Sequence, residues 1–359
     1  MRRVALPFLV LALALGASRG RPATAEDSPA PRWVLDVAPA KTVVAVLECE
    51  VPTPPSGPLT VLAPVPPTTD GQRVLDATFR PDATTVADTL GGNSMFCAVW
   101  KAAPKTKDRP KRIPVVWQVR VELHTRRLRA LDDGETAPAG KPRVLDAADR
   151  KRCTSPTSRH DFLAPSFIEW TKARSLGRTK GERDLDFARR AFLEIRRSTT
   201  YSYPPPSIDR IATHVCRDGT SDCSGLNSLF VALLRSQGVP ARVLVGRWAT
   251  STVADGTLRG VPYRQTHVKA EFWADGLGWV PVDAGLDIPY TSDEAALANF
   301  GQDAGDFVVF HSGSDLRVEV PTRPGTPIDL LGLQQPWAFP LPSGDRTFDE
   351  AAWSVFERR

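Results

Sequence analysis

A run of alternating side chains in the first half of the chain limits the possible folds more than any other feature. Every odd position from 115 to 123 is apolar, and the even positions from 118 to 124 are polar or charged. A period of two is typical of a β-strand with one buried face. Shorter runs of this kind cover 42–50, 72–79 and 95–100, with turns between them. The pattern predicts a β-sandwich over residues 30–135.

The proline content agrees with a β-rich start. The 33 prolines among 359 residues are about twice the usual share of ~5%. Proline breaks helices and is found in turns and edge strands, so this content argues against a helical bundle.

Helical periods begin only after residue 160. Apolar residues recur at helical spacing between Leu185 and Ile195. The clearest helix carries Leu226, Leu229, Phe230, Leu233 and Leu234 at i, i+3, i+4, i+7 and i+8. Thr220, Ser221 or Asp222 can cap its start, and Gly238 and Pro240 follow its end.

Two strands, 265–273 and 279–283, follow that helix around a turn at 274–278. We therefore expect an α+β protein with a sandwich first and a mixed helix-and-sheet core second. The expected parts are a signal peptide 1–25, the sandwich 30–135, a linker 136–165, the core 166–320 and a C-terminal tail 321–359.

Two smaller elements are predicted near the end of the chain. Strands 306–311 and 316–320 flank a short turn, which is typical of a hairpin. Thr347 and Glu350 match a capping box before an expected terminal helix over 351–356.

The first residues have the pattern of an export signal. Arg2 and Arg3 precede an apolar run over 4–15, and Ala23-Thr24-Ala25 fits a small-x-small cleavage site. The run is shorter than the ~20 apolar residues that a spanning helix needs. We expect a secreted or periplasmic protein with no membrane span after signal removal; the alternative is an uncleaved anchor.

The charge does not favour nucleic acid as a partner. The formal net charge is +5, but four arginines lie in the predicted signal, so 42 basic residues remain against 41 acidic ones. The basic stretch 101–112 is interpreted as a solvated loop between two strands.

The five cysteines are Cys49, Cys97, Cys153, Cys216 and Cys223. An exported protein can form disulfides, and an odd count leaves at least one free thiol. We expect Cys49 to pair with Cys97 and Cys223 to stay free.

No metal or cofactor is expected. Neither a Cys-x-x-Cys pair nor a helical His-x-x-x-His pair is present for zinc, and Asp303 and Asp306 do not form a calcium loop. The residues considered for zinc are His214, Cys216, Cys223 and His267.

Cys223 lies in the first turn of the clearest helix, where unpaired N–H groups and the positive end of the helix dipole favour a thiolate. The same N–H groups can hold an oxyanion. Asn227, one turn later, either lines the cleft or makes a hydrogen bond within the helix.

A nucleophilic thiol needs a base that a third group orients. A turn near 275–276 pairs residues whose numbers sum to roughly 551, so His267 faces about position 284 and Asp283 is a direct or diagonal neighbour. Lys269 and Glu271 share the parity of His267; we expect them on a solvated cross-strand face, and the alternative is that they rim the site.

Three segments together resemble the transglutaminase-like superfamily. Asp222-Cys223-Ser224-Gly225 with 233–243 resembles its cysteine motif, 266–272 its histidine motif and 278–283 its aspartate motif, in family order. The resemblance covers residues 185–320 best and implies a papain-like core with Cys223, His267 and Asp283 as a catalytic triad. Many members carry Trp where this chain has Lys269. Tyr201 and Tyr203 are candidates for the side chain that completes the oxyanion hole.

This resemblance implies a cysteine-dependent acyl-transfer enzyme that acts on amide bonds of protein or peptide substrates through a thioester. Water as the second nucleophile gives a peptidase or amidase, and a lysine amine gives a crosslinking transglutaminase. The alternative function is a non-catalytic binding or structural module of the cell envelope.

Overall fold

The structure is a computed structural model. It describes residues 33–54, 57–101, 111–132, 134–135, 143–207, 209–250, 257–258, 261–262, 265–286, 291–340 and 351–358. The predicted signal peptide and the capping pair Thr347 and Glu350 lie outside these residues. Across the described part of the chain, no helix is long and apolar enough to cross a membrane.

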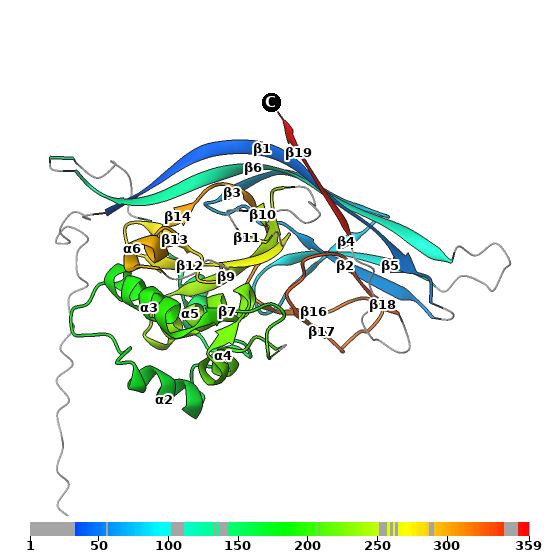
Figure 1. Ribbon diagram of the computed structural model, residues 1–359. Coiled ribbons are helices and arrows are strands. Elements are labelled where there is room, and N and C mark those ends of the chain that lie inside the picture. The colour runs from blue at the N-terminus through cyan, green and yellow to red at the C-terminus, as the bar shows by residue number, and fades with distance from the viewer. Residues whose placement is uncertain are drawn as a thin grey trace, which may run out of the picture.

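Two very long strands arch over the molecule (Figure 1). β1 (Trp33–Pro52) and β6 (Arg112–Ala130) pair antiparallel over their length. β3 (Gln72–Arg80) and β14 (Gln302–Asp303) pair with β6, and β19 (Ala352–Arg358) pairs with β1. The odd-numbered apolar side chains from 115 to 123 on β6 are fully buried, which confirms the period-two interpretation.

A second sheet packs against this long sheet and completes the predicted sandwich. Its order is β18 (Trp337–Pro340), β2 (Leu59–Val65), β5 (Ser94–Trp100) and β4 (Thr84–Ala87). Val43 of β1, Val61 of β2 and Trp117 of β6 share the core between the sheets. The Trp117 indole donates to the carbonyl of Pro64 at 2.7 Å, so its buried N–H is satisfied.

The predicted terminal helix over 351–356 is wrong, because these residues form β19 instead. Trp353 is buried against Trp117 and Phe310 in the sandwich core, and its indole donates to the carbonyl of Trp248 at 2.9 Å. Pairing with the edge of β1 satisfies the backbone hydrogen bonds of β19 and at the same time buries the Trp353 indole. The tail 321–359 therefore supplies strands to both sheets of the sandwich.

The predicted hairpin of 306–311 and 316–320 is also wrong. β15 (Phe307–Ser312) pairs with β9 (Ala241–Trp248), whereas β16 (Asp315–Val318) pairs with β17 (Ile328–Leu331). The intervening Gly313 has φ +79° and donates its N–H to Val243 of β9. This contact keeps β15 on the β9 sheet while the chain turns away.

A third sheet lies between the long sheet and the helices (Figure 1). Its order is β13 (Gly278–Val282), β12 (Thr266–Ala274), β9 and β15. The helices are α1 (Ala147–Thr154), α2 (Pro165–Ala173), α3 (Asp184–Ser198), α4 (Ala212–Asp218), α5 (Cys223–Ser236) and α6 (Asp293–Leu297). Short strands β7 (Thr200–Tyr201) and β8 (Thr220–Ser221) pair parallel, and β10 (Thr257–Leu258) pairs with β11 (Val261–Pro262).

The helix predicted most clearly is α5, and its apolar residues face α3, β9 and β12 in one core. α1 lies inside the expected linker 136–165, where Asp146 accepts two backbone N–H bonds at its start and Cys153 is buried. Strands outside the expected sandwich pair with its strands: β14 of the expected core pairs with β6, and β19 of the expected tail pairs with β1. The boundaries of the expected parts stay a prediction.

The predicted disulfide between Cys49 and Cys97 is wrong. All five cysteines are free. Cys49 on β1 packs against the core between the two sandwich sheets. Cys97 on β5 packs on another core, with Leu316 and Leu330. The two thiols therefore face different cores.

Candidate active site

Cys223 is placed by the start of α5. The Asp222 side chain accepts the N–H bonds of Ser224 and Gly225 at 3.0 and 3.2 Å, so Asp222 is the N-cap among the three predicted candidates. A Cβ on Gly225 would stand 2.0 Å from Ser221 Oγ, so only glycine permits this close entry into the helix. Arg210 donates to the other Asp222 oxygen at 2.6 Å and fixes the cap.

His267 and Asp283 meet at the neighbouring sheet. His267 Nε2 lies 2.7 Å from Asp283 Oδ2, and both residues are about 5% exposed. The register pairs Ala270 with Val282, so the residue numbers sum to 552 rather than the expected 551, and Asp283 follows directly after β13. The expected neighbourhood of His267 and Asp283 is present.

The imidazole also reaches the thiol. His267 forms a side-chain hydrogen bond with Cys223, and because Nε2 faces Asp283, Nδ1 is the ring atom left for the sulfur. The structure therefore brings Cys223, His267 and Asp283 together from α5, β12 and the end of β13.

The charges of this group hold a proton on His267. Burial alone would lower the pKa of His267, but the charges and hydrogen bonds of Asp283 and Cys223 outweigh it and raise the pKa to about 10. Burial alone would raise the pKa of Asp283, yet the charge and hydrogen bond of His267 hold that pKa below its usual value. An imidazolium beside a thiol is the arrangement that favours a reactive thiolate.

Aromatic rings enclose the imidazole. Trp248 stacks on His267 with ring centroids 4.6 Å apart and an interplanar angle of 23°. Phe307 meets the same ring edge-on at 6.0 Å and 89°. These contacts fix the plane of the imidazole and keep water from it. Sequence periodicity does not reveal this role, because Trp248 and Phe307 lie on different strands.

Asn227 links the three site segments, which resolves the two alternatives left open by the sequence. Its Nδ2 lies 3.0 Å from the carbonyl of Cys223, 2.9 Å from that of Val268 and 3.3 Å from Asp283 Oδ1. Its Oδ1 accepts the N–H of Ala284 at 3.1 Å. The side chain is fully buried, so it positions the site from behind and does not line a cleft.

The segment after Asp283 lies directly against the tip of α5. A Cβ on Gly285 would stand 2.4 Å from Cys223 Cα, so glycine is needed for this approach. Arg196 of α3 donates to the carbonyls of Ala284 and Leu286 at 3.1 and 3.2 Å. Close approach and these bonds hold Asp283 in place.

The start of α5 offers one backbone donor to an oxyanion. Because Asp222 takes the N–H groups of Ser224 and Gly225, the N–H of Cys223 itself remains without an acceptor among the described contacts. Of the two tyrosine candidates, Tyr201 pairs with Ser221, two residues before Cys223, and is half-buried. Tyr203 is 53% exposed.

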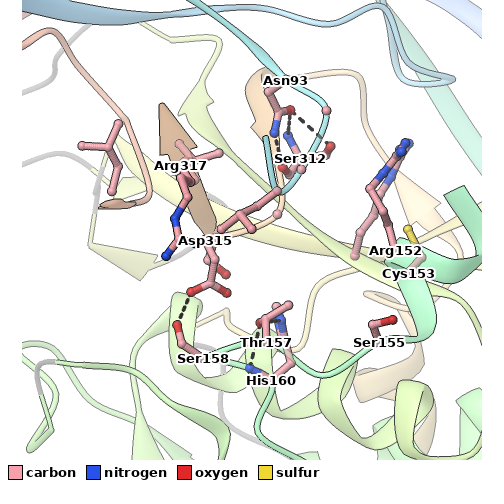
Figure 2. Close-up of a pocket in the computed structure, with 18 of the residues that line it drawn as sticks. Asn93, Arg152, Cys153, Ser155, Thr157, Ser158, His160, Ser312, Asp315 and Arg317 are labelled. Atoms are coloured by element: carbon pink, nitrogen blue, oxygen red, sulfur yellow. Dashed lines mark hydrogen bonds between the residues drawn. The ribbon is translucent and has the colours of Figure 1, made fainter. Parts of the chain in front are cut away.

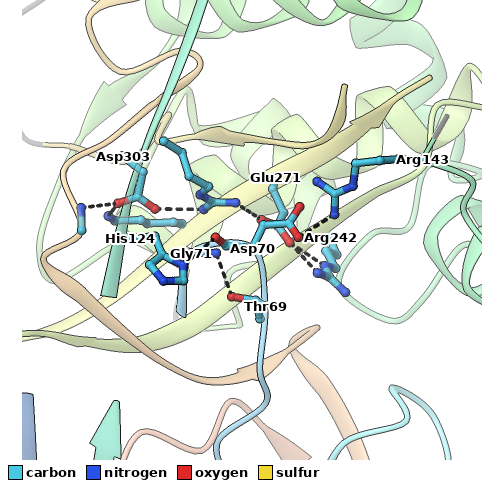
Figure 3. A network of polar contacts seen from close by, with 11 residues as sticks. Thr69, Asp70, Gly71, His124, Arg143, Arg242, Glu271 and Asp303 are labelled. Carbon is cyan, nitrogen blue, oxygen red and sulfur yellow. Dashed lines mark hydrogen bonds and ion pairs between the residues drawn. The ribbon is translucent and has the colours of Figure 1, made fainter. Parts of the chain in front are cut away.

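The expected solvated face at Lys269 and Glu271 is wrong, because both side chains are buried under the long sheet. Glu271 accepts from Arg126 of β6 at 2.8 Å and from Arg242 of β9 at 2.7 Å (Figure 3). Asp303 of β14 bridges Arg126 and Lys269 at 2.9 and 3.3 Å (Figure 3). We call these five residues the buried charge network; it connects the sandwich to the strand that carries His267.

Comparisons with known proteins were made for the whole chain. Residues 172–284, which include all three site residues, match the transglutaminase-like superfamily. An uncharacterized protein of Haemophilus influenzae is 34% identical over 74 residues, which is 17% of this chain and 20% of that protein. The chain therefore matches about a fifth of the length of this curated relative.

Two solved structures are also similar. A candidate cysteine protease from Cytophaga hutchinsonii is 14% identical with a TM-score of 0.52, covering 90% of this chain and 93% of that one. The periplasmic domain of TgpA from Pseudomonas aeruginosa is 15% identical with a TM-score of 0.34, covering 70% and 74%. The superfamily match confirms the predicted resemblance, and the first structure confirms the predicted α+β fold.

Proposed function

We propose that the transglutaminase-like domain of this chain is a cysteine-dependent acyl-transfer enzyme that acts on amide bonds of protein or peptide substrates. The observation that carries the proposal is the chain of contacts in which Asp283 holds His267 and His267 holds Cys223. A thiol, a base and an orienting carboxylate in this order are the parts that nucleophilic catalysis needs.

In the first half of the reaction, the Cys223 thiolate attacks the carbonyl carbon of the amide and an S–C bond forms. The carbonyl electrons move onto oxygen, and the N–H of Cys223 donates to that oxyanion. When the tetrahedral intermediate collapses, the C–N bond breaks. His267 gives its proton to the leaving amine, so an acyl thioester and a neutral imidazole remain.

In the second half, an incoming nucleophile resolves the thioester. Neutral His267 takes a proton from water or from a primary amine as that molecule attacks the thioester carbon. The C–S bond then breaks, the thiolate returns, and His267 is again protonated. Water yields a carboxylic acid and makes the protein a peptidase or amidase; a lysine amine yields a new amide and makes it a crosslinker.

The proposed site of action is outside the cytoplasm. The basic start, short apolar run and small-x-small sequence within residues 1–25 support cleavage by a signal peptidase. Cell fractionation followed by N-terminal sequencing of the mature chain tests this location; a chain that keeps Met1 in the cytoplasm contradicts it.

Selective alkylation tests the proposed nucleophile. Burial raises the pKa of Cys49 and Cys97 to about 11 and that of Cys216 to about 12, and it also raises the pKa of Cys153. A thiol with a pKa near 11 has about 100-fold less thiolate at neutral pH than one at the ordinary 9.0. Iodoacetamide at pH 7 should therefore label Cys223 first, which peptide mass mapping detects.

The base is tested in the same assay. His267→Ala should slow labelling of Cys223 by about 100-fold, because general-base assistance contributes ~10²–10⁴-fold. His124→Ala, on β6 outside the site, is the control and should label at the wild-type rate. An inert Cys223, or equal rates for the two variants, would favour the non-catalytic binding module.

A second assay distinguishes a hydrolase from a crosslinking transglutaminase. The protein is incubated with a glutamine-bearing protein and a labelled primary amine, and both amine incorporation and peptide cleavage are followed. Cleavage alone identifies a hydrolase, and incorporation identifies a transglutaminase. Cys223→Ala should abolish whichever product forms; a product that survives this substitution contradicts the proposed mechanism.

A further inference from the structure

A cavity of about 810 Å³ lies at the opposite end of α5 from Cys223. Arg235 lines the cavity from the last turn of α5, and Cys223 begins the first turn, so the two are ~18 Å apart at 1.5 Å per residue. The cavity is therefore separate from the thiol site. Its volume falls within the ~300–1,000 Å³ of small-molecule sites.

Both halves of the protein line this cavity. Residues 149–160 and the end of α5 form one wall. Residues 90–94 and the β16–β17 hairpin form the facing wall. Figure 2 shows labelled residues from both walls around the space. A ligand in it would contact the sandwich and the helical core at once.

Three residues that line the cavity each carry a buried polar side-chain atom that has no partner among the described residues. These atoms are His160 Nε2, Ser314 Oγ and Asp315 Oδ2. His160 is 1% exposed and Ser314 is 4% exposed. Buried polar atoms are almost always hydrogen-bonded in native proteins, so three unsatisfied atoms on residues around one cavity indicate a partner from outside the chain.

The contacts of His160 favour a donor in the cavity. Thr157 Oγ1 accepts the backbone N–H of His160 and lies 2.9 Å from the ring Nδ1 (Figure 2). The hydroxyl of Thr157 can donate its proton to Nδ1, and in the tautomer that accepts this bond the ring proton is on Nε2. Burial and the charges of Arg235 and Arg159 hold the pKa of His160 well below its usual value, so the ring is neutral and Nε2 offers one N–H.

The charges at the cavity are of both signs. Arg235 is buried and donates to the carbonyls of Ala241 and Ser155 at 2.8 and 3.0 Å; no carboxylate forms an ion pair with it in the described structure. Asp315 accepts from Ser158 through Oδ1, which leaves Oδ2 for another donor (Figure 2). Three further arginines line the cavity, and each forms an ion pair: Arg152 with Asp149, Arg242 with Glu271 and Arg317 with Asp329. Arg235, Asp315 and the exposed Lys151 are left without an ion pair among the described residues.

We infer that this cavity binds a small zwitterion of the amino-acid class. Its carboxylate would accept from Arg235 and from His160 Nε2–H, and its ammonium group would donate to Asp315 Oδ2. Ser314 Oγ can donate to the same carboxylate. Such a ligand satisfies the unpartnered atoms and balances both charges, which water or a neutral polyol does not do.

Calorimetry on the full mature chain tests this inference. Cys223 is first blocked with iodoacetamide, so that binding at the thiol site is excluded. The probes are L-alanine, L-leucine, L-glutamate and L-lysine, each compared with its amide, which lacks the carboxylate, and with its desamino acid, which lacks the ammonium. At least one amino acid should bind ten-fold or more tightly than both of its analogues.

Two variants locate the binding. Asp315→Asn should weaken the amino acid by about ten-fold and leave its desamino analogue unchanged, because only the ammonium partner is lost. Asp329→Asn is the matched control: it removes the same charge from the same cavity, but Asp329 already pairs with Arg317 at 2.7 Å. It should bind like the wild type.

Two results would overturn the inference. One is the absence of binding by all four amino acids, which would leave a cavity filled with water only. The other is equal affinity of the wild type and Asp315→Asn. Labelling of Cys223 in unblocked protein reports separately on the proposed enzyme, so either hypothesis can fail while the other stands.

Discussion

At the scale of single residues, the site depends on how a buried histidine keeps its proton. Aromatic rings exclude water from His267, which by itself disfavours a charged imidazole. The carboxylate of Asp283, 2.7 Å away, more than offsets this cost. In the proposed reaction, His267 would therefore hold the proton that the leaving amine needs before substrate arrives.

This arrangement predicts a specific titration. The folded pKa of His267 is about 10, above its ordinary 6.5, so its charged form adds stability that is complete below pH 6.5 and is lost as pH rises through 10. Asp283→Asn removes the largest cause of the rise but keeps the burial, so the pKa should fall by at least one. NMR of histidine-labelled protein measures it directly.

The other histidines give internal references for that titration. Burial lowers the pKa of His311 to about 4, and its ring should stay neutral in both proteins across pH 6–10. A His267 signal that titrates near 6.5 in the wild type contradicts the proposed ion pair.

Asn227 supports a second prediction, because it binds the carbonyl of Cys223, the Asp283 carboxylate and the N–H of Ala284. Asn227→Ala leaves those groups unsatisfied, which should cost about 1–3 kcal/mol of unfolding free energy. It should also slow iodoacetamide labelling of Cys223 about ten-fold and lower the pKa of His267.

Ser228→Ala is the matched control for Asn227. Ser228 is the next residue on α5 and equally buried, but its Oγ has no partner among the described residues. Its loss should leave all three readouts unchanged: the unfolding free energy, the labelling rate of Cys223 and the pKa of His267. If Asn227→Ala reduces stability without changing labelling or the histidine pKa, its role is structural only.

At the scale of elements, local signals predicted more than distant ones. The α5 helix, its Asp222 cap and the β12–β13 hairpin follow from neighbouring residues, and they placed Cys223, His267 and Asp283. β19 did not follow, since its partner β1 lies some 300 residues earlier and a capping box favoured a helix locally. The long-range pairing with β1 therefore favours a strand over the locally predicted helix at this end of the chain.

A substitution on β19 shows what this pairing stabilises. Trp353→Ala should cost about 3–5 kcal/mol, because it removes a fully buried indole from the sandwich core. It also removes the hydrogen bond to Trp248, whose ring stacks on His267. Urea unfolding measures the first effect, and labelling of Cys223 measures the second.

Phe356→Ala on the same strand is the control. Phe356 is 59% exposed, so its loss should change the unfolding free energy by less than about 0.5 kcal/mol. If Trp353→Ala lowered the unfolding free energy no more than Phe356→Ala does, burial of the Trp353 indole would not be what β19 contributes to stability.

At the scale of the whole molecule, the buried charge network joins the sandwich to the thiol site. Arg126 comes from the long sheet and Glu271 from β12, 145 residues later. Sequence parity placed Glu271 on the same face as His267 but could not show that the long sheet covers that face. Only the packing of two sheets turns a solvated face into a buried one.

The last prediction concerns the acid side of stability. The charges of Lys269 and Arg126 hold the pKa of Asp303 below its usual value, although burial opposes them. A lowered folded pKa means that the stabilisation is present above the ordinary value of 3.8 and is lost as pH falls through the lower folded value. Asp303→Asn should therefore cost about 3–5 kcal/mol at pH 7, the usual cost of breaking a buried pair.

This cost should shrink as pH falls from 3.8 towards the lower folded pKa, because the wild type progressively loses the stabilisation by the charged carboxylate over that range. Asp36→Asn is the control, since Asp36 pairs with Arg129 at an exposed surface and should cost less than about 1 kcal/mol. Urea unfolding at pH 3 and pH 7 gives both comparisons. A gap between Asp303→Asn and wild type that stays constant with pH would show that the carboxylate charge does not hold sandwich and core together.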